Sequence, residues 1–128
     1  MRFNHQSAPY AIISVDYEGN FSSFSPELLG QKSERYGDFA LGNVYIDSFE
    51  DALNSPKFKL INDDIQNGIS RCKSSCEYYQ VCGGGAPSNK YYENGSFDSA
   101  ETLFCKLSIK TPTDIVLSKL ENELAVLC

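Results

Sequence analysis

Three of the five cysteines of this 128-residue chain lie between positions 72 and 82, and no other feature constrains the fold as strongly. A fourth cysteine follows downstream. Thiols this close in sequence are poorly explained by core packing, because a core residue needs neighbours from elsewhere in the fold. Thiolates are soft metal ligands, and four of them suit a tetrahedral zinc ion or an iron–sulfur cluster. The sequence therefore predicts one metal centre with the ligands Cys72, Cys76, Cys82 and Cys105.

The spacing of the cysteines favours one kind of centre. Zinc ribbons usually present two C-x2-C pairs, whereas the gaps here are x3, x5 and x22. A cubane cluster is larger than one ion and spreads its ligands over a wider surface, so these gaps favour one [4Fe-4S] cluster. The run Gly83-Gly84-Gly85 would let the backbone pass close to such a cluster and direct amides at its sulfides. Zinc on the same four cysteines is the alternative.

The remaining cysteine and the single histidine do not join this site. Cys128 is terminal and has no partner at ligand spacing, and His5 lies in an N-terminal segment that we expect to be solvated. One histidine and no paired nucleophile and base leave little for acid–base catalysis. The glycine run is not followed by Gly-Lys-Ser/Thr, so it does not predict a phosphate loop. We expect no catalytic residue in this chain.

Charge and hydropathy disfavour several classes of partner. The formal net charge is −6 and Lys and Arg form no stripe, which argues against binding to nucleic acid or to an anionic membrane. No apolar run approaches the ~18 residues of a membrane span. The N-terminus lacks the apolar region of a secretory signal. We therefore expect a cytoplasmic protein, in which cysteines favour metal or redox chemistry over disulfides.

The first part of the chain predicts strands. Residues 10–16 and 21–24 are expected to form a β-hairpin, because the Gly-Asn pair between them tolerates the positive φ of a tight turn. Residues 31–38 are expected to be a polar loop. Residues 39–45 predict a short extended piece with a turn at their own Gly-Asn pair.

Short helices are expected to follow. Ser48 and Ser55 are placed to cap two of them, because a serine oxygen can accept from the free amides of a first helical turn. The second helix should end at Gly68, a residue type common just past helix ends. Its apolar residues at helical spacing are Phe58, Ile61 and Ile65.

The last part of the chain predicts two more helices. One, from about Ser99, is expected to carry Cys105, and the next should begin at Thr111-Pro112. The predicted fold class is therefore α+β, as one small domain with an N-terminal hairpin, short helices and a cysteine-rich loop. The expected division is an N-terminal segment 1–9, an iron–sulfur domain 10–110, and a C-terminal helix 111–128 packed on it.

The cysteine region and several other pieces resemble the C-terminal SPASM domain of radical SAM peptide maturases. The most similar are the maturases of the glycine-rich-repeat and cyclophane-forming branch. The resemblance covers about residues 10–107, which is most of the chain. The matching pieces are residues 72–90, 93–97 and 101–105, together with 16–21, 24–30 and 37–44.

This resemblance implies one auxiliary cluster. The central family motif is roughly C-x2-C-x5-C-x3-C, but the first gap here is three and Ala86 stands where the fourth cysteine would fall. No cysteine precedes Cys72, so the upstream ligands of the first auxiliary cluster are absent. The four remaining cysteines are the set that the resemblance assigns to the second cluster, which implies one [4Fe-4S] cluster with full cysteinyl ligation.

The catalytic motif of radical SAM enzymes, C-x3-C-x2-C, is not present. Tyr79 occupies its third position, and the chain is too short for the catalytic barrel. The resemblance therefore implies an accessory domain for the modification of a ribosomally synthesised peptide, acting in electron transfer or peptide binding. Its expected partners are a radical SAM catalytic domain or chain and a precursor peptide. The alternatives are a zinc-binding protein-interaction module and a non-functional fragment without metal.

Overall fold

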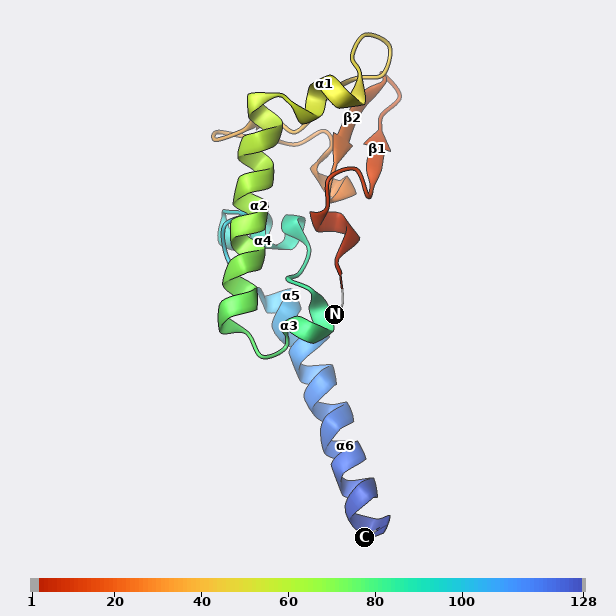
Figure 1. The fold of residues 1–128 in the computed structure, drawn as a ribbon, viewed down its shortest axis with the longest axis vertical. Helices are drawn as coiled ribbons and strands as arrows, with labels where there is room; N and C mark the ends of the chain where they lie inside the picture. The colour runs from red at the N-terminus through yellow and green to blue at the C-terminus, as the bar shows by residue number, and fades with distance from the viewer. Residues whose placement is uncertain (1–2, 128) are drawn as a thin grey trace.

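The computed structural model describes residues 3–127 and shows an elongated α+β molecule (Figure 1). Helix α2 (Pro56–Ser75) runs along one side, with a small sheet near its start and α4 (Pro87–Asn94) beside its middle. Helix α6 (Thr111–Leu127) leads away from these elements to the far end of the molecule. The predicted α+β class is confirmed.

The N-terminal hairpin is confirmed. Strands β1 (Ile13–Val15) and β2 (Asn20–Ser23) pair antiparallel, with Val15 opposite Phe21. At the turn Gly19 takes a φ of +90°, in the left-handed region that favours glycine. Asn20 needs no such conformation, because it already lies in β2.

Two expectations about the strands that follow are wrong. The Gly-Asn pair expected as a turn forms β5 (Gly42–Asn43), which pairs with β2 and gives the order β1-β2-β5. Glycine is needed there because a Cβ at Gly42 would lie 2.9 Å from the Phe21 ring. The predicted loop 31–38 contains a second, two-stranded sheet, β3 (Lys32–Ser33) with β4 (Gly37–Asp38).

Both predicted serine caps are confirmed. Ser48 precedes α1 (Phe49–Leu53), and its Oγ accepts a hydrogen bond from the amide of Asp51 at 3.0 Å. Ser55 precedes α2, and its Oγ accepts from the amide of Phe58 at 3.2 Å. Each cap satisfies an amide that the first helical turn leaves without a partner.

Helix α2 does not end at Gly68, and that prediction is wrong. The helix continues to Ser75 and carries Cys72 in its last turn. Gly68 has a different role, because a Cβ at this position would lie 2.1 Å from the backbone oxygen of Phe97. The glycine lets the segment around Phe97 approach the helix backbone, so it marks a packing contact.

The last helices are also joined differently from the expectation. Helix α5 (Leu103–Cys105) begins after Thr102, not near Ser99, and Thr102 Oγ1 accepts from the Cys105 amide at 3.0 Å. A π turn, η3 (Lys106–Lys110), then leads without a break into α6. The π turn comes just before Pro112, whose ring would clash with a carbonyl one turn earlier in a regular α-helix.

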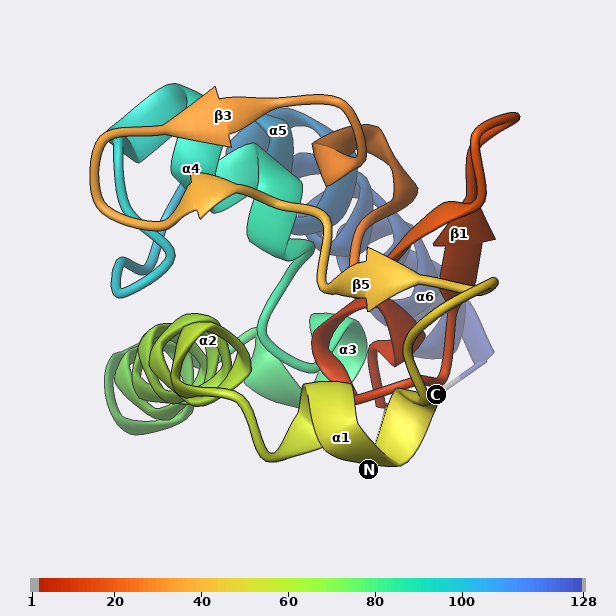
Figure 2. The same ribbon diagram turned by 90° about the horizontal axis from the view of Figure 1, so that it is seen from above.

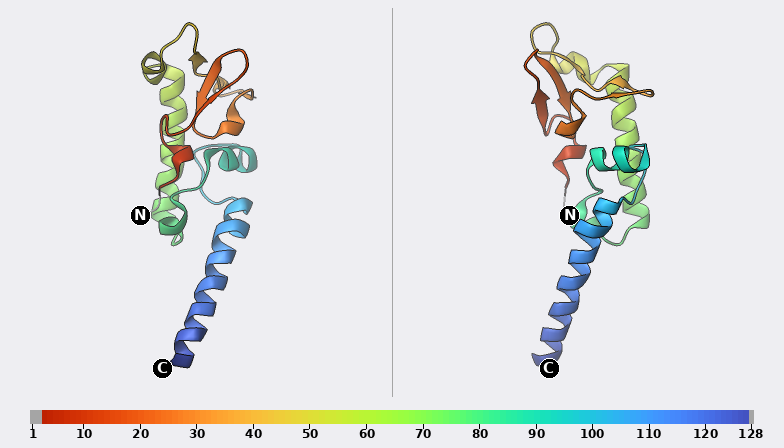
Figure 3. Two further views of the ribbon diagram at one scale, coloured as in Figure 1. Left: turned by 90° about the vertical axis from the view of Figure 1, so that its right-hand side faces the viewer. Right: turned by 180° about the vertical axis from the view of Figure 1, so that it is seen from behind.

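Helix α6 has no buried residue and extends away from the domain in both views of Figure 3, where we expected a helix packed on it. No described helix is long and apolar enough to cross a bilayer. The side chains that α6 leaves exposed include Ile115, Val116, Leu117, Leu120, Leu124, Val126 and Leu127.

The core is largely aromatic and lies beside α2. Figure 2 looks along this helix, with β3 and α4 facing it across the core and β1 and β5 to the side. The helix contributes the three apolar residues expected at helical spacing. Phe97 is fully buried and its ring centre lies 5.2 Å from that of Tyr91. The core residues are Phe24, Leu28, Tyr36, Phe39, Phe58, Ile61, Ile65 and Phe97.

The N-terminal segment contacts the domain. It contains the 3-10 turn η1 (His5–Ser7), and Ser7 is buried. The Gln66 side chain on α2 donates to the Ser7 carbonyl at 3.0 Å. The Ser25 hydroxyl, before the second 3-10 turn η2 (Pro26–Leu28), donates to the Gln6 side chain at 3.0 Å. These bonds hold the segment against α2 and against the start of η2.

Asp64 is the one carboxylate of α2 that faces the core, and it is 9 % exposed. Its oxygens accept from Arg35 Nε at 2.8 Å and Nη2 at 3.3 Å, and from the Tyr36 hydroxyl. Burial by itself would raise the pKa of this carboxyl, but the hydrogen bonds from Arg35 and Tyr36 outweigh burial and hold the pKa below its ordinary value. The same burial, with Asp64 nearby, raises the pKa of Tyr36.

We expect Asp64→Asn to lower the free energy of unfolding at pH 7 by about 1–2 kcal/mol, because it weakens hydrogen bonds to a charged group. A depressed folded pKa gives stability above the unfolded value of about 4 and loses it as the pH falls through the folded value. The deficit should therefore shrink below about pH 4. Urea unfolding at pH 7, 5 and 3 measures it, with the exposed Asp63→Asn as control. A deficit independent of pH would contradict this assignment.

Candidate metal centre

All four predicted ligands line one cavity of about 600 Å³. Cys72 lies in the last turn of α2, and Cys76 is its C-terminal cap, with the Cys76 amide donating to the Cys72 carbonyl at 2.9 Å. Cys82 ends the short helix α3 (Tyr79–Cys82), and Cys105 ends α5. The structure thus brings together thiols from three helices. Cys72 and Cys76, which the x3 gap separates, lie one helical turn apart at the end of α2.

The glycine run lies beside this cavity, which Gly84 and Gly85 line. Gly83, Gly84 and Gly85 have φ values of +71°, +105° and +78°, all in the left-handed region. Gly83 caps α3, and a Cβ at Gly84 would lie 3.1 Å from the Ile69 side chain on α2. Three successive residues therefore need glycine, because the backbone turns back against α2 in a conformation that other residues rarely adopt.

The glycine backbone also contacts two of the thiols. The Gly84 amide donates to Cys82 Sγ at 3.3 Å, and the Cys72 thiol lies 3.7 Å from the Gly84 carbonyl as its donor. Cys72 is only 8 % exposed. The glycine run predicts amides directed at the sulfides of a cluster, and the structure shows one of its amides directed at a cysteine sulfur.

The thiols on different helices are close enough to influence one another. Burial, followed by the nearby Cys82 and then Cys76, raises the pKa of the Cys105 thiol, and Lys110 opposes the effect. The four cysteines between positions 3 and 127 are all free thiols. Cys128 lies outside the described residues.

The cavity differs from a compact single-ion site. A zinc ion needs four ligands at about 2.0–2.3 Å, so the thiols must point to one centre. Among residues 3–127, no group of three or more His, Cys, Asp or Glu is arranged to hold one metal ion. The four thiols instead line one larger cavity. As soft ligands they form a donor set that suits either a zinc ion or an iron–sulfur cluster.

Two lysines and the single histidine also line the cavity. Lys90 on α4 and Lys110 on η3 both line it, and Lys110 Nζ donates to Glu101 Oε1 at 2.6 Å. His5, expected to be solvated, is exposed but also lines the cavity, with its ring 5.3 Å from Phe3. Lys90 and Lys110 gave no signal in the sequence, because neither belongs to a ligand motif.

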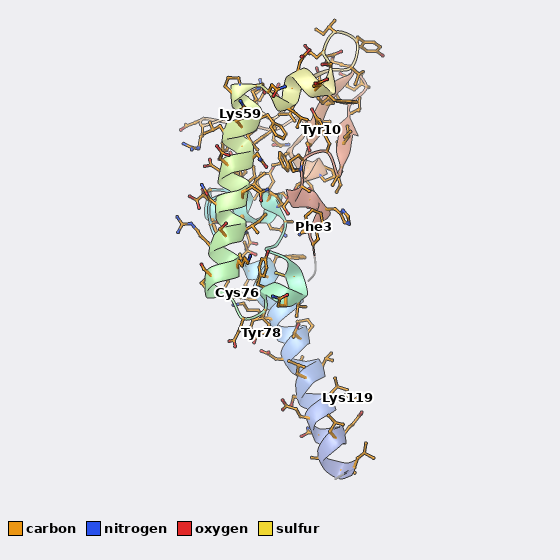
Figure 4. The ribbon with its side chains drawn as sticks, in the orientation of Figure 1. Phe3, Tyr10, Lys59, Cys76, Tyr78 and Lys119 are labelled. Atoms are coloured by element: carbon orange, nitrogen blue, oxygen red, sulfur yellow. The ribbon has the colours of Figure 1, made fainter. Side chains whose placement is uncertain are left out.

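Tyr78 connects the cysteine loop to the start of α6. Its hydroxyl donates to Asp114 Oδ1 at 2.6 Å, and Lys110 Nζ lies 5.3 Å from its ring centre. The hydrogen bond to Asp114, and secondarily burial, raise the pKa of the Tyr78 hydroxyl. Figure 4 shows Tyr78 next to Cys76 at the lower end of α2. These contacts hold η3, and with it Cys105, near the other thiols.

The chain was compared with known protein families, curated proteins and solved structures. No family model and no solved structure matches the chain. It is 46 % identical over 127 residues to "Uncharacterized protein sll1766" of Synechocystis, in a match that covers 98 % of this chain and 32 % of that protein. The chain therefore spans about a third of the length of the curated relative that it matches.

Proposed function

We propose that this chain is an accessory [4Fe-4S] domain of a radical SAM maturase that modifies a ribosomally synthesised peptide. The observation that carries the proposal is that Cys72, Cys76, Cys82 and Cys105 line one cavity. The resemblance of the cysteine region to SPASM domains supports the same assignment. The match covers about a third of the Synechocystis relative, so that relative has room for a further domain beside the matched one.

The chain's own residues would have defined roles in this domain. The four thiolates would hold the cluster, and the amide of Gly84 would stabilise negative charge on Cys82 Sγ. A bound cluster would supply a one-electron donor or acceptor. Ligation by four cysteines leaves no open position for substrate. Electron transfer, or maintenance of a peptide-binding surface, is therefore favoured over direct ligation of the substrate.

In this proposal the reaction is carried out by a separate radical SAM catalytic domain or chain. The third position of the catalytic motif is Tyr79, so we expect no cleavage of S-adenosylmethionine by this chain alone. The proposed partners are a radical SAM catalytic domain or chain and a precursor peptide, in the cytoplasm.

Metal analysis after anaerobic expression tests the proposal. We expect a brown protein that absorbs near ~400 nm and contains about four irons per chain. A colourless protein with one zinc per chain would sink the proposal in favour of the zinc module. A folded protein that takes up neither metal would leave the non-functional fragment as the better interpretation.

A further inference from the structure

Lys90 is a buried lysine whose side chain lines the cysteine cavity. It lies on α4 and is only 4 % exposed. A Cβ at Gly68 would lie 3.3 Å from Lys90 Nζ, and one at Gly85 would lie 3.9 Å from its Cε. The side chain therefore lies between α2 and the glycine run. Within residues 3–127, no carboxylate forms an ion pair with its ammonium.

The other charged groups at the cavity do not neutralise Lys90. Glu101 already pairs with Lys110 at 2.6 Å and with Lys106 at 3.3 Å. The remaining ionisable side chains that line the cavity in the described part of the chain are His5 and the cysteines. Of these, only a deprotonated thiol is negative. A buried charge without an opposite charge is costly, so this arrangement favours an anionic occupant.

We propose that Lys90 is the counter-charge of the thiolate-ligated cluster and raises its reduction potential. This inference rests on the proposed function. Four thiolates give the site a net negative charge, which increases when one electron enters from an external reductant, with no bond made or broken. A nearby cation attracts the more negative, reduced form more strongly. The low exposure of Lys90 keeps water and salt from screening this attraction.

The test compares wild-type protein with Lys90→Met, which keeps a long apolar stem and removes the charge. In the iron-loaded protein we expect the reduction equilibrium to shift about tenfold toward the oxidised form, or about 59 mV more negative for one electron. Redox titration followed by EPR measures the shift. Lys73→Met is the matched control, because Lys73 is adjacent to Cys72 but exposed, so its charge is screened.

Urea unfolding of the metal-free protein gives a second readout with a different expectation. There Lys90→Met should unfold at the same or a higher urea concentration than wild type, because it removes an unpaired buried charge. A lysine needed only for packing would behave differently. Its replacement would lower the urea midpoint of the metal-free protein and leave the potential at the wild-type value, and that result would overturn the proposal.

Two further outcomes are also decisive. If Lys90→Met takes up no iron, Lys90→Arg separates charge from shape: recovery of iron supports the counter-charge, and continued loss overturns it. A wild-type chain without iron would overturn the proposed function and this inference together. If wild type binds iron but Lys90→Met has the same reduction potential as wild type, only the proposed role of Lys90 is overturned.

Discussion

Replacing Cys82 with alanine is expected to reduce the iron content of anaerobically prepared protein from about four per chain to near zero. Cys82 ends α3, lines the cavity and accepts the Gly84 amide, so its loss removes a ligand and leaves that amide without its sulfur partner. Metal binding to such a site is coupled to folding. We therefore also expect the free energy of unfolding of the iron-loaded protein to fall by several kcal/mol.

Iron analysis, the visible spectrum and urea unfolding measure these changes in parallel. Cys128→Ala is the matched control, because the sequence leaves this cysteine without a partner at ligand spacing. It should keep the iron content and stability of wild type. If Cys82→Ala also kept the iron content and stability of wild type, the four cysteines would not act as one ligand set. That result would support the interpretation as a fragment without metal.

Gly68→Ala is expected to destabilise the protein by about 3 kcal/mol, although alanine is the better helix former. In an exposed helix interior the same change would stabilise by about 1 kcal/mol. Here the new Cβ would lie 2.1 Å from the Phe97 carbonyl oxygen and 3.0 Å from that of Ser99. Both obstacles are backbone atoms, so the segment must move away from α2. That movement would disturb the fully buried Phe97 ring.

The neighbouring Asn67→Ala is the matched control for Gly68→Ala. Asn67 lies in the same helix but is exposed, so alanine should leave stability unchanged or raise it by a few tenths of a kcal/mol. Urea unfolding of the two variants gives the comparison. Equal stability of Gly68→Ala and wild type would mean that α2 and the Phe97 segment do not pack backbone to backbone.

The starts of α1 and α2 and the first hairpin were predictable because their causes are local. Ser48 and Ser55 cap their helices through amides only three residues away. Gly19 permits the turn of the hairpin through its own φ. The helical spacing of Phe58 and Ile65 likewise placed one face of α2 in the core. Each of these features depends on a few consecutive residues or on apolar residues that recur at helical spacing.

The four cysteines were predicted to lie together, and all four line one cavity, but the residues around them were not predictable. Spacing singled out the thiols that line the cavity, and the glycine run was correctly expected beside them. The spacing of the cysteines did not indicate that Lys90 would be buried at the cavity. Helix α4 reaches the cavity only after the chain has passed through three glycines in the left-handed conformation. The end of α2 was missed for a related reason, since a glycine at a helix end and one at a close contact look alike in sequence.

The sequence by itself determined the caps of α1 and α2 and the hairpin turn, because these follow from neighbouring residues. Only the tertiary structure decided that Gly68 meets Phe97, and that Lys90 is buried at the cysteine cavity with no carboxylate of residues 3–127 as its ion-pair partner. These outcomes depend on contacts between residues distant in the chain. Excluded volume and the burial of charge therefore decided them, and neither can be read from a local pattern.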